Sequence, residues 1–213
     1  MLVSISTMPA GEKYLEYAKQ IQDFADFLHL DVCDGKYNTS RCFSPQFAKI
    51  VNDNSTIPMD CHLMTKHPLL QAKEYIKAGV NIVTAQIETF ETTKQIEEFI
   101  EYVKTHNTLV GLSLEPDTEI KRVLPYLDKL DVVLVMSVQT GKSGQKFNDI
   151  SLSKIEYLAN LRVNYNYNYK IEVDGGITYQ TAQLVKQSGA DIIVSGNYVY
   201  NSQNKHESIE KLR

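Results

Sequence analysis

The sequence predicts a (β/α)8 barrel, a fold in which eight parallel strands alternate with helices, as a single domain over residues 1–213. Two observations predict it. Short β-branched or apolar runs alternate with longer amphipathic runs along the whole chain, which is typical of repeated βα units and a parallel sheet. The length of 213 residues also suits one such domain, and no stretch without these signals is left over for a second.

The strands are predicted from runs rich in valine, isoleucine and leucine. Several runs are apolar at consecutive positions, as expected for strands that are covered on both faces. In chain order the predicted strands are residues 2–6, 27–32, 57–64, 81–87, 108–114, 131–138, 169–175 and 190–196. Eight such units close most simply into a barrel of the TIM type. An open, doubly wound sheet is the alternative, but no GxGxxG or P-loop lysine motif supports it.

The helices are predicted from the spacing of apolar residues. Clear helical patterns cover residues 68–79, 92–106 and 178–190. In the second of these, apolar residues at i, i+3, i+4 and i+7 form one face of a helix. The low-complexity tract at 164–168, NYNYN, is interpreted as a surface connection without a functional role.

Composition and charge argue against several classes of partner. The formal net charge is −4 and the lysines and arginines are scattered, so we expect neither a nucleic-acid partner nor a membrane surface. No run approaches the ~18 apolar residues that a membrane-spanning helix needs, and the first residues do not resemble a signal peptide. The three cysteines, Cys33, Cys42 and Cys61, form no even set and no CxxC pair, which suits a reducing compartment. We therefore expect a cytoplasmic protein.

Polar side chains fall where several predicted strands end, at the face where such barrels build their sites. His29 and Asp31 share one face of a strand because side chains alternate with period two. His62 and Asp174 occupy similar positions on two other strands. A lone histidine in an apolar strand is usually a hydrogen-bonded core residue, but four such residues at one rim favour a shared ligand. Two imidazoles and two carboxylates suit one divalent cation, Zn²⁺, Fe²⁺, Mn²⁺ or Co²⁺.

Glycine-rich loops follow three of the predicted strands, at residues 140–145, 174–176 and 195–197. Each glycine by itself is explained by a tight βα turn. Together the loops present backbone N–H groups where barrels commonly hold a phosphate, so the sequence also predicts a phosphate site.

These motifs identify a resemblance over essentially the whole chain. The matching segments, in order, are VSIS, HLDVCDG, PMDCHLM, VLVMSVQTGKSGQKF, IEVDGG and VSGN. They resemble the ribulose-phosphate 3-epimerase family, and DCHLM is also similar to enzymes that act on allulose 6-phosphate. The resemblance implies interconversion of D-ribulose 5-phosphate and D-xylulose 5-phosphate in the pentose phosphate pathway, by an enzyme that is commonly a homo-oligomer. The alternative is 3-epimerisation of another ketose phosphate, such as D-allulose 6-phosphate.

The resemblance also assigns roles to residues. It implies that His29, Asp31, His62 and Asp174 bind the catalytic metal, and that Asp31 and Asp174 form the acid–base pair. Inverting a carbon next to a ketone needs a proton donor and an acceptor on opposite faces, which two carboxyls can supply. The implied substrate-binding residues are Ser4, His62, Met64, Gly141, Lys142, Ser143, Gly144, Gly175, Gly176, Gly196 and Asn197.

The sequence departs from the family pattern at several positions. Cys33 replaces a usual methionine, Gln86 stands where a histidine is frequent, and residues 36–43 and 140–145 are unusual. We expect Cys33 to line the pocket and Cys61, of opposite parity to His62, to face the helices. Lys142 could add a charge to the phosphate site. A related decarboxylase or aldolase is disfavoured, because its Asp-x-Lys-x-x-Asp array is absent. A non-catalytic binding barrel is disfavoured by the four intact ligand positions.

Overall fold

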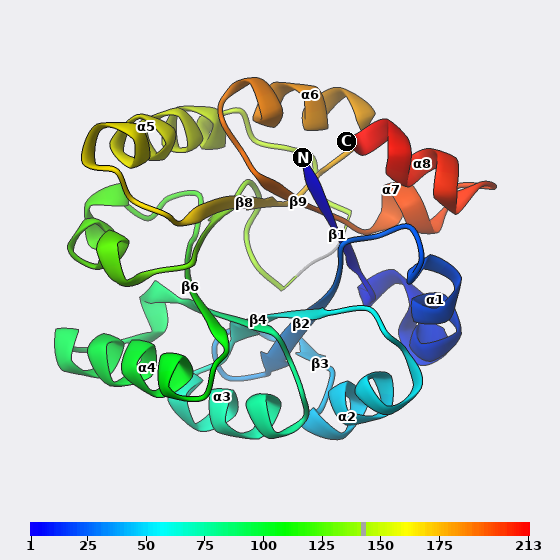
Figure 1. Ribbon diagram of the computed structural model, residues 1–213, viewed down its shortest axis with the longest axis horizontal. Helices are drawn as coiled ribbons and strands as arrows, with labels where there is room; N and C mark the ends of the chain where they lie inside the picture. The colour runs from blue at the N-terminus through cyan, green and yellow to red at the C-terminus, as the bar shows by residue number, and fades with distance from the viewer. Residues whose placement is uncertain (142–143) are drawn as a thin grey trace.

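A closed parallel barrel forms the centre of the computed structural model, which describes residues 1–141 and 144–213. The strands form an inner ring with the helices around it (Figure 1). The sheet order is β1-β9-β8-β7-β6-β5-β4-β2-β3, and a further pairing of β1 with β2 closes the barrel. The barrel strands are β1 (Leu2–Ser6), β2 (Phe27–Asp34), β4 (Met59–Met64), β5 (Ile82–Gln86), β6 (Leu109–Leu114), β7 (Val132–Met136), β8 (Lys170–Asp174) and β9 (Ile192–Ser195). The predicted (β/α)8 fold is confirmed.

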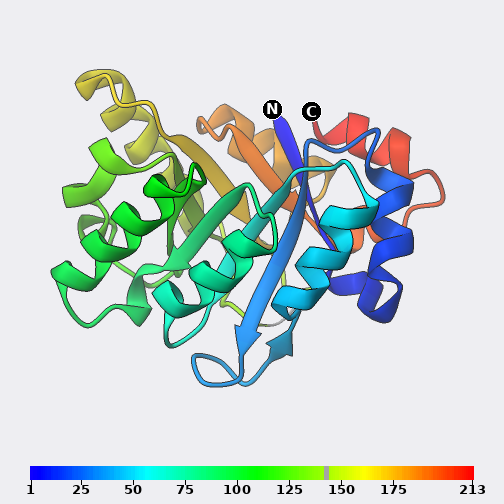
Figure 2. The same cartoon turned by 60° about the horizontal axis from the view of Figure 1, so that its bottom comes forward.

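A short extra strand, β3 (Arg41–Cys42), was not predicted. It pairs antiparallel with the end of β2, so that Cys33 lies opposite Cys42 and Asp34 opposite Arg41. Figure 2 shows the β3 arrow beside the tip of the β2 arrow, with the loop between them at one end of the barrel. Two residues give too little periodicity to identify a strand from sequence, which is why the pattern missed it.

Helical segments cover the outside of the barrel. They are η1 (Met8–Lys13), α1 (Tyr14–Ile21), α2 (Pro45–Asn54), α3 (Pro68–Lys77), η2 (Ile87–Thr89), α4 (Thr93–Thr105), η3 (Ile120–Arg122), η4 (Leu124–Lys129), α5 (Ile150–Tyr165), α6 (Tyr179–Gln187), α7 (Asn197–Tyr200) and α8 (Lys205–Leu212). Helix α4 begins with a capping box, in which Thr92 and Gln95 each bind the other's backbone N–H. None of these helices in the described ranges is long and apolar enough to cross a membrane.

The predicted helices correspond to α3, α4 and α6, with two differences elsewhere. Between β6 and β7 the chain forms only the short 3₁₀ segments η3 and η4. Helix α5 continues to Tyr165, so the tract at 164–168 is partly helical rather than wholly a connection. It ends at Asn166, whose left-handed conformation (φ 54°) is one that asparagine tolerates better than most residues.

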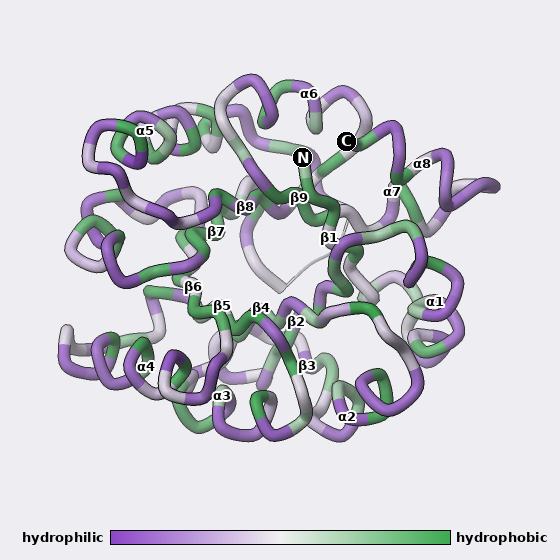
Figure 3. Tube along the Cα trace, viewed as in Figure 1, coloured by the Kyte–Doolittle hydropathy of each residue, from purple (hydrophilic) through white to green (hydrophobic). Residues whose placement is uncertain are grey.

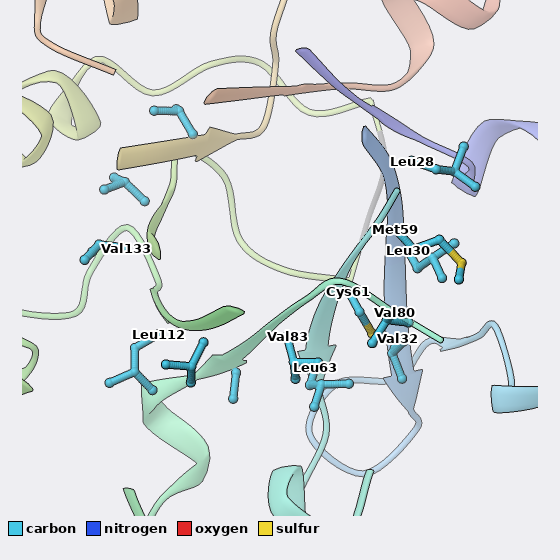
Figure 4. Packing of buried hydrophobic residues seen from close by; sticks show 14 of the residues in the cluster. Leu28, Leu30, Val32, Met59, Cys61, Leu63, Val80, Val83, Leu112 and Val133 are labelled. Carbon is cyan, nitrogen blue, oxygen red and sulfur yellow. The ribbon is translucent and has the colours of Figure 1, made fainter. Parts of the chain in front are cut away.

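The hydrophobic core lies between the strands and the surrounding helices. Leu28, Leu30 and Val32 of β2 are buried in it, together with Cys61 and other residues of β4 (Figure 4). The hydropathy-coloured trace shows the same arrangement, with an apolar inner ring and mixed outer helices (Figure 3). Cys61 therefore faces the helix layer, as predicted, and the alternate positions of β2 and β4 turn polar side chains into the barrel.

Phe99 tests the importance of this core. Its side chain is fully buried on α4 and its ring lies 5.5 Å from that of Phe90. We expect Phe99→Ala to lower the free energy of unfolding by about 3–5 kcal/mol, because it removes buried area and leaves a cavity. Urea denaturation measures this change. Val163→Ala, at a residue that is 78% exposed on α5, is the matched control and should change stability by less than about 0.5 kcal/mol.

Candidate active site and metal centre

The register of β2 against β4 stacks polar side chains inside the barrel. His29 lies opposite Asp60, and Asp31 lies opposite His62. All four side chains are almost fully buried. Because the strands are parallel and alternate with the same phase, their inward residues form successive layers from the barrel interior toward its carboxyl end.

The four predicted metal ligands converge on one point. His29, Asp31, His62 and Asp174 each offer a ligand atom, and these atoms all lie within 4.8 Å of one another. They come from β2, β4 and β8, so closure of the barrel is what brings them together. Two nitrogens and two carboxylate oxygens are a donor set that suits Zn²⁺, Fe²⁺, Mn²⁺ or Co²⁺.

The histidine nitrogens in this group are available for a cation. His29 Nε2 lies 3.5 Å from Asp31 Oδ1, which is longer than an ordinary hydrogen bond. It has no hydrogen-bond partner among the described residues, and neither ring nitrogen of His62 has one either. Burial, followed by the nearby His29, lowers the pKa of His62 to about 4, so this imidazole is neutral at pH 7. Orphaned, buried nitrogens of this kind fit a bound cation.

His29 is held in place by Asp60. The Nδ1 atom of His29 lies 2.7 Å from Asp60 Oδ2, which also accepts a hydrogen bond of 3.1 Å from Ser4 Oγ. Burial lowers the pKa of His29, but Asp60 and Asp31 outweigh it and raise the pKa well above its usual value, so both ring nitrogens hold protons without a cation. A bound cation would replace the Nε2 proton while Nδ1 still donates to Asp60. Such a carboxylate fixes the tautomer and orientation of a ligating histidine.

The two predicted acid–base residues have pKa values shifted in opposite directions. Burial alone would raise the pKa of Asp31, but the charge of the nearby His29 outweighs it and the pKa is lowered. Burial, followed by the negative charge of Asp31, raises the pKa of Asp174 to about 7. Asp31 is therefore ionised at neutral pH, while Asp174 is about half protonated there, so the two carboxyls can hold different protonation states as an acid–base pair requires.

A second carboxyl pair lies beneath this site and was not predicted. Asp60, Glu172 and His29 offer atoms within 4.8 Å of one another, and all three residues are fully buried. Burial and the adjacent Asp60 raise the pKa of Glu172 well above its usual value. Strand alternation could have indicated both residues, since Asp60 has the parity of His62 and Glu172 that of Asp174.

A cavity of about 790 Å³ opens beside the group formed by His29, Asp31, His62 and Asp174. Asp31, Asp174 and Met64 line it next to that group, and the glycine loops line it further along. Its size falls within the range of small-molecule sites. The predicted substrate residues that line it are Met64, Gly141, Gly144, Gly175, Gly176, Gly196 and Asn197. Lys142 and Ser143 lie outside the described residues.

Gly176 has a steric reason to be glycine. A Cβ atom at this position would lie 2.3 Å from the backbone nitrogen of Phe147, and its φ of +61° disfavours other residues. The chain following β8 therefore packs directly against the segment that follows residues 140–145. This contact brings two of the three glycine loops to one end of the cavity.

Three residues lie elsewhere than expected. Ser4 and His62 are fully buried below the cavity and do not line it; Ser6, two positions after Ser4, does so. Ser6 Oγ donates a 2.8 Å hydrogen bond to Asp31 Oδ2, a contact that the shared parity of Ser4 and Ser6 could have indicated. Cys33 does not line the main cavity either. Its Sγ contacts Met64 Sδ at 4.0 Å, and it borders a smaller cavity of about 390 Å³.

Glu115 at the end of β6 connects several loops around the cavity. It accepts hydrogen bonds from Tyr37 Oη at 3.0 Å, Gln86 Nε2 at 3.1 Å and the backbone N–H of Thr140 at 3.2 Å. Burial raises the pKa of its carboxyl group. The unusual Gln86 thus binds this carboxyl group, and no sequence signal identified Glu115.

Comparison with known proteins identifies a family. The family model described as the ribulose-phosphate 3 epimerase family matches residues 3–200. The ribulose-phosphate 3-epimerase of Schizosaccharomyces pombe is 33% identical over 201 residues, covering 93% of this chain and 85% of that protein. The Helicobacter pylori (strain J99) protein of the same name is 31% identical over 202 residues, covering 94% and 92%. The Bacillus subtilis one is 31% identical over 190 residues, covering 89% and 86%.

Solved structures support the fold. A 3-keto-L-gulonate-6-phosphate decarboxylase from Vibrio cholerae matches with a TM-score of 0.74 and 11% identity, covering 100% of this chain and 95% of that one. A 3-hexulose-6-phosphate synthase from Salmonella typhimurium matches with a TM-score of 0.70 and 16% identity, covering 100% and 96%. At such identities the likeness shows a shared barrel and carries no statement about chemistry.

Asp60 provides a test of the metal centre. We expect Asp60→Ala to weaken binding of Zn²⁺ by about 10–100-fold, because His29 loses the carboxylate that orients it. Asp60→Asn retains an acceptor oxygen and should weaken binding less. Competition with a chromophoric chelator measures the affinity. Equal affinity of Asp60→Ala and the unsubstituted chain would contradict the positioning role.

The raised pKa of Asp174 predicts how stability depends on pH when no metal is bound. Between its usual value of 3.8 and about 7, the folded chain keeps a proton that the unfolded chain has released. Stability contributed by this group is therefore lost as the pH rises across that range, by at most about 4 kcal/mol. Asp174→Asn removes the titration, so its stability relative to the unsubstituted chain should rise from pH 4 to pH 8. Urea denaturation with a chelator measures it; a constant difference would contradict the assignment.

Proposed function

The chain belongs to the ribulose-phosphate 3-epimerase family, and from this premise we propose that it is a metal-dependent isomerase that interconverts D-ribulose 5-phosphate and D-xylulose 5-phosphate. The proposed reaction, a step of the pentose phosphate pathway, removes the proton at C3 and returns one to the opposite face. The observation that carries the proposal is the pair Asp31 and Asp174, whose pKa values are shifted in opposite directions beside one cavity.

The proposed acid–base roles follow from the protonation states. Asp31, ionised and held by Ser6, takes the proton from C3 of one epimer. Asp174, whose raised pKa of about 7 keeps a protonated fraction at neutral pH, delivers its proton to the other face of the planar enediolate. In the reverse direction the two residues exchange roles, because the product leaves Asp31 protonated and Asp174 ionised. Their strands are separated in the barrel by β1 and β9, which supports an approach from two sides.

His29, Asp31, His62 and Asp174 are the residues that would hold the divalent cation. When bound, the cation supplies Lewis acidity that stabilises negative charge on the sugar oxygens next to C3. Asp60 orients His29 in this arrangement, and burial keeps His62 neutral so that its lone pair stays available. Met64 and Met136 provide an apolar lining beside the two aspartates, which limits the access of water to them.

The glycine end of the cavity is proposed to hold the phosphate. Gly175, Gly176, Gly196 and Asn197 line it, with Gly141 and Gly144 on the adjacent segment. Backbone N–H groups at glycine loops bind phosphate without side chains, since the absence of a Cβ lets the anion approach closely. Binding the phosphate far from C3 positions the sugar between the aspartates. A contribution of the Lys142 charge to phosphate binding stays a prediction. The cytoplasmic location and the assembly into a homo-oligomer also stay predictions.

An assay of purified protein with D-ribulose 5-phosphate in D₂O tests the proposal. We expect conversion to D-xylulose 5-phosphate with deuterium incorporated at C3, loss of activity with a chelator, and recovery when a divalent cation is added. Asp31→Asn and Asp174→Asn should each lower kcat/KM by about 10²–10⁴-fold, because each removes the proton carrier for one face. Asp53→Asn, at an exposed aspartate on α2, is the matched control.

The pattern of hydrogen–deuterium exchange at C3 distinguishes a two-base mechanism from a mechanism with one base. A single variant that loses net conversion while still exchanging the C3 hydrogen of one epimer would be expected for two bases. Exchange that persists when both aspartates are substituted would contradict the assignment. D-allulose 6-phosphate, assayed in parallel, should be the poorer substrate.

A further inference from the structure

Two cysteine thiols face each other at the end of β2. Cys33 of β2 pairs directly with Cys42 of β3 in antiparallel register, and both are free thiols. Directly opposite residues of an antiparallel pair share a face and have Cα atoms about 4.5–5.5 Å apart. That separation lies within the range of about 4.4–6.8 Å that a disulfide bond needs.

Small molecules can reach this pair. Both cysteines line the smaller cavity of about 390 Å³, and Cys42 is partly exposed. The neighbouring Cys33 thiol lowers the pKa of Cys42 below its usual value, which favours the reactive thiolate there. Cys61 differs in each respect, because it is fully buried under the helices. Cys42 is therefore the reactive thiol of the pair, because its hydrogen bond and burial raise the pKa of Cys33, and Cys61 is inert.

The pair also borders the site described above. Cys33 Sγ contacts Met64 Sδ at 4.0 Å and accepts a weak hydrogen bond from Asn38 Nδ2 at 3.8 Å. Met64 lines the main cavity. Ser40, in the loop that joins the two cysteines, donates a 2.5 Å hydrogen bond to the carbonyl of Gly141. Met64 and Gly141 thus connect the pair to two parts of the cavity wall.

We propose that Cys33 and Cys42 are a redox-active dithiol, a modification site that a peroxide converts reversibly into a disulfide. The Cys42 thiolate attacks one oxygen of hydrogen peroxide, the O–O bond breaks and water leaves, giving a sulfenic acid. Cys33 then attacks that sulfur, the S–S bond forms and a second water leaves. The two thiols lose two electrons and two protons, and the peroxide is reduced to two waters.

The disulfide has a structural consequence. The bond fixes Cys33 Sγ against Cys42 Sγ beside Met64, and residues 34–41 become a closed loop. Because this loop holds Ser40 against Gly141, oxidation should change the affinity for the phosphorylated sugar more than the acid–base chemistry. We expect KM to change several-fold with a smaller change in kcat, a consequence that rests on the proposed function.

Tryptic mapping tests the bond itself. Cleavage after Lys19, Lys36, Arg41, Lys49 and Lys66 places the three cysteines in separate peptides, residues 20–36, 42–49 and 50–66. The full chain, loaded with Zn²⁺ so that the metal cannot be oxidised, is treated with hydrogen peroxide and then alkylated. We expect peptide 20–36 linked to 42–49, with a mass about 2 Da below their sum, and separation of the two by dithiothreitol.

Two variants complete the test. Cys61→Ser should form the same linked peptide, whereas Cys42→Ser should form none and should keep its KM when peroxide is added. Failure to recover the 20–36/42–49 link, or an equal response of Cys42→Ser to peroxide, would overturn the inference. A chain that forms the link but does not convert the pentulose phosphate would refute the proposed function and leave the modification site standing.

Discussion

The register of β2 against β4 is the constraint on which the rest of the site depends. It sets His29 beside Asp60, Asp31 beside His62, and Cys33 beside Met64. A slip of one residue would turn every one of these side chains outward into the apolar layer between barrel and helices. Leu28, Leu30 and Val32, which fill that layer, would then face the interior. Burial of the apolar residues at alternate positions therefore stabilises this register, and the register in turn places the polar side chains inside the barrel.

Burying so many ionisable groups is costly, and their arrangement reduces the cost. Burial disfavours the ionised form of all four carboxyls at the barrel interior. His29 lies between Asp31 and Asp60 and lowers the pKa of both. Each of these carboxylates has a second carboxyl beside it, Asp174 or Glu172, whose pKa is raised. Neighbouring carboxyls are thus split into ionised and protonated members, and a bound cation would offset the remaining negative charge.

The residues that depart from the family pattern lie mainly in loops at the carboxyl ends of the strands, around the ionisable groups inside the barrel. Glu115 connects the loop after β2 to Thr140 through hydrogen bonds, and Ser40 reaches Gly141 from the same loop. The unusual segment 36–43 is therefore linked to the unusual segment 140–145, and their departures from the family pattern occur at positions in contact. The Cys33–Cys42 pair lies where this loop leaves and rejoins the sheet. A rigid barrel lets the residues of these connected loops vary while the groups inside the barrel stay in place.

The sequence by itself determined the barrel, its strand order along the chain, and the four residues whose ligand atoms converge, His29, Asp31, His62 and Asp174. It could do so because alternation fixes which strand residues face inward, and parallel strands carry their ends to one rim. The depth of Ser4, the pairing of Cys33 with Cys42 and the network around Glu115 were decided only by the tertiary structure. Each depends on the stagger of one strand against another or on the path of a loop, and neither leaves a periodic signal in the chain. The difference in pKa between Asp31 and Asp174 was also decided only by the tertiary structure, because a pKa depends on the groups that the fold brings near.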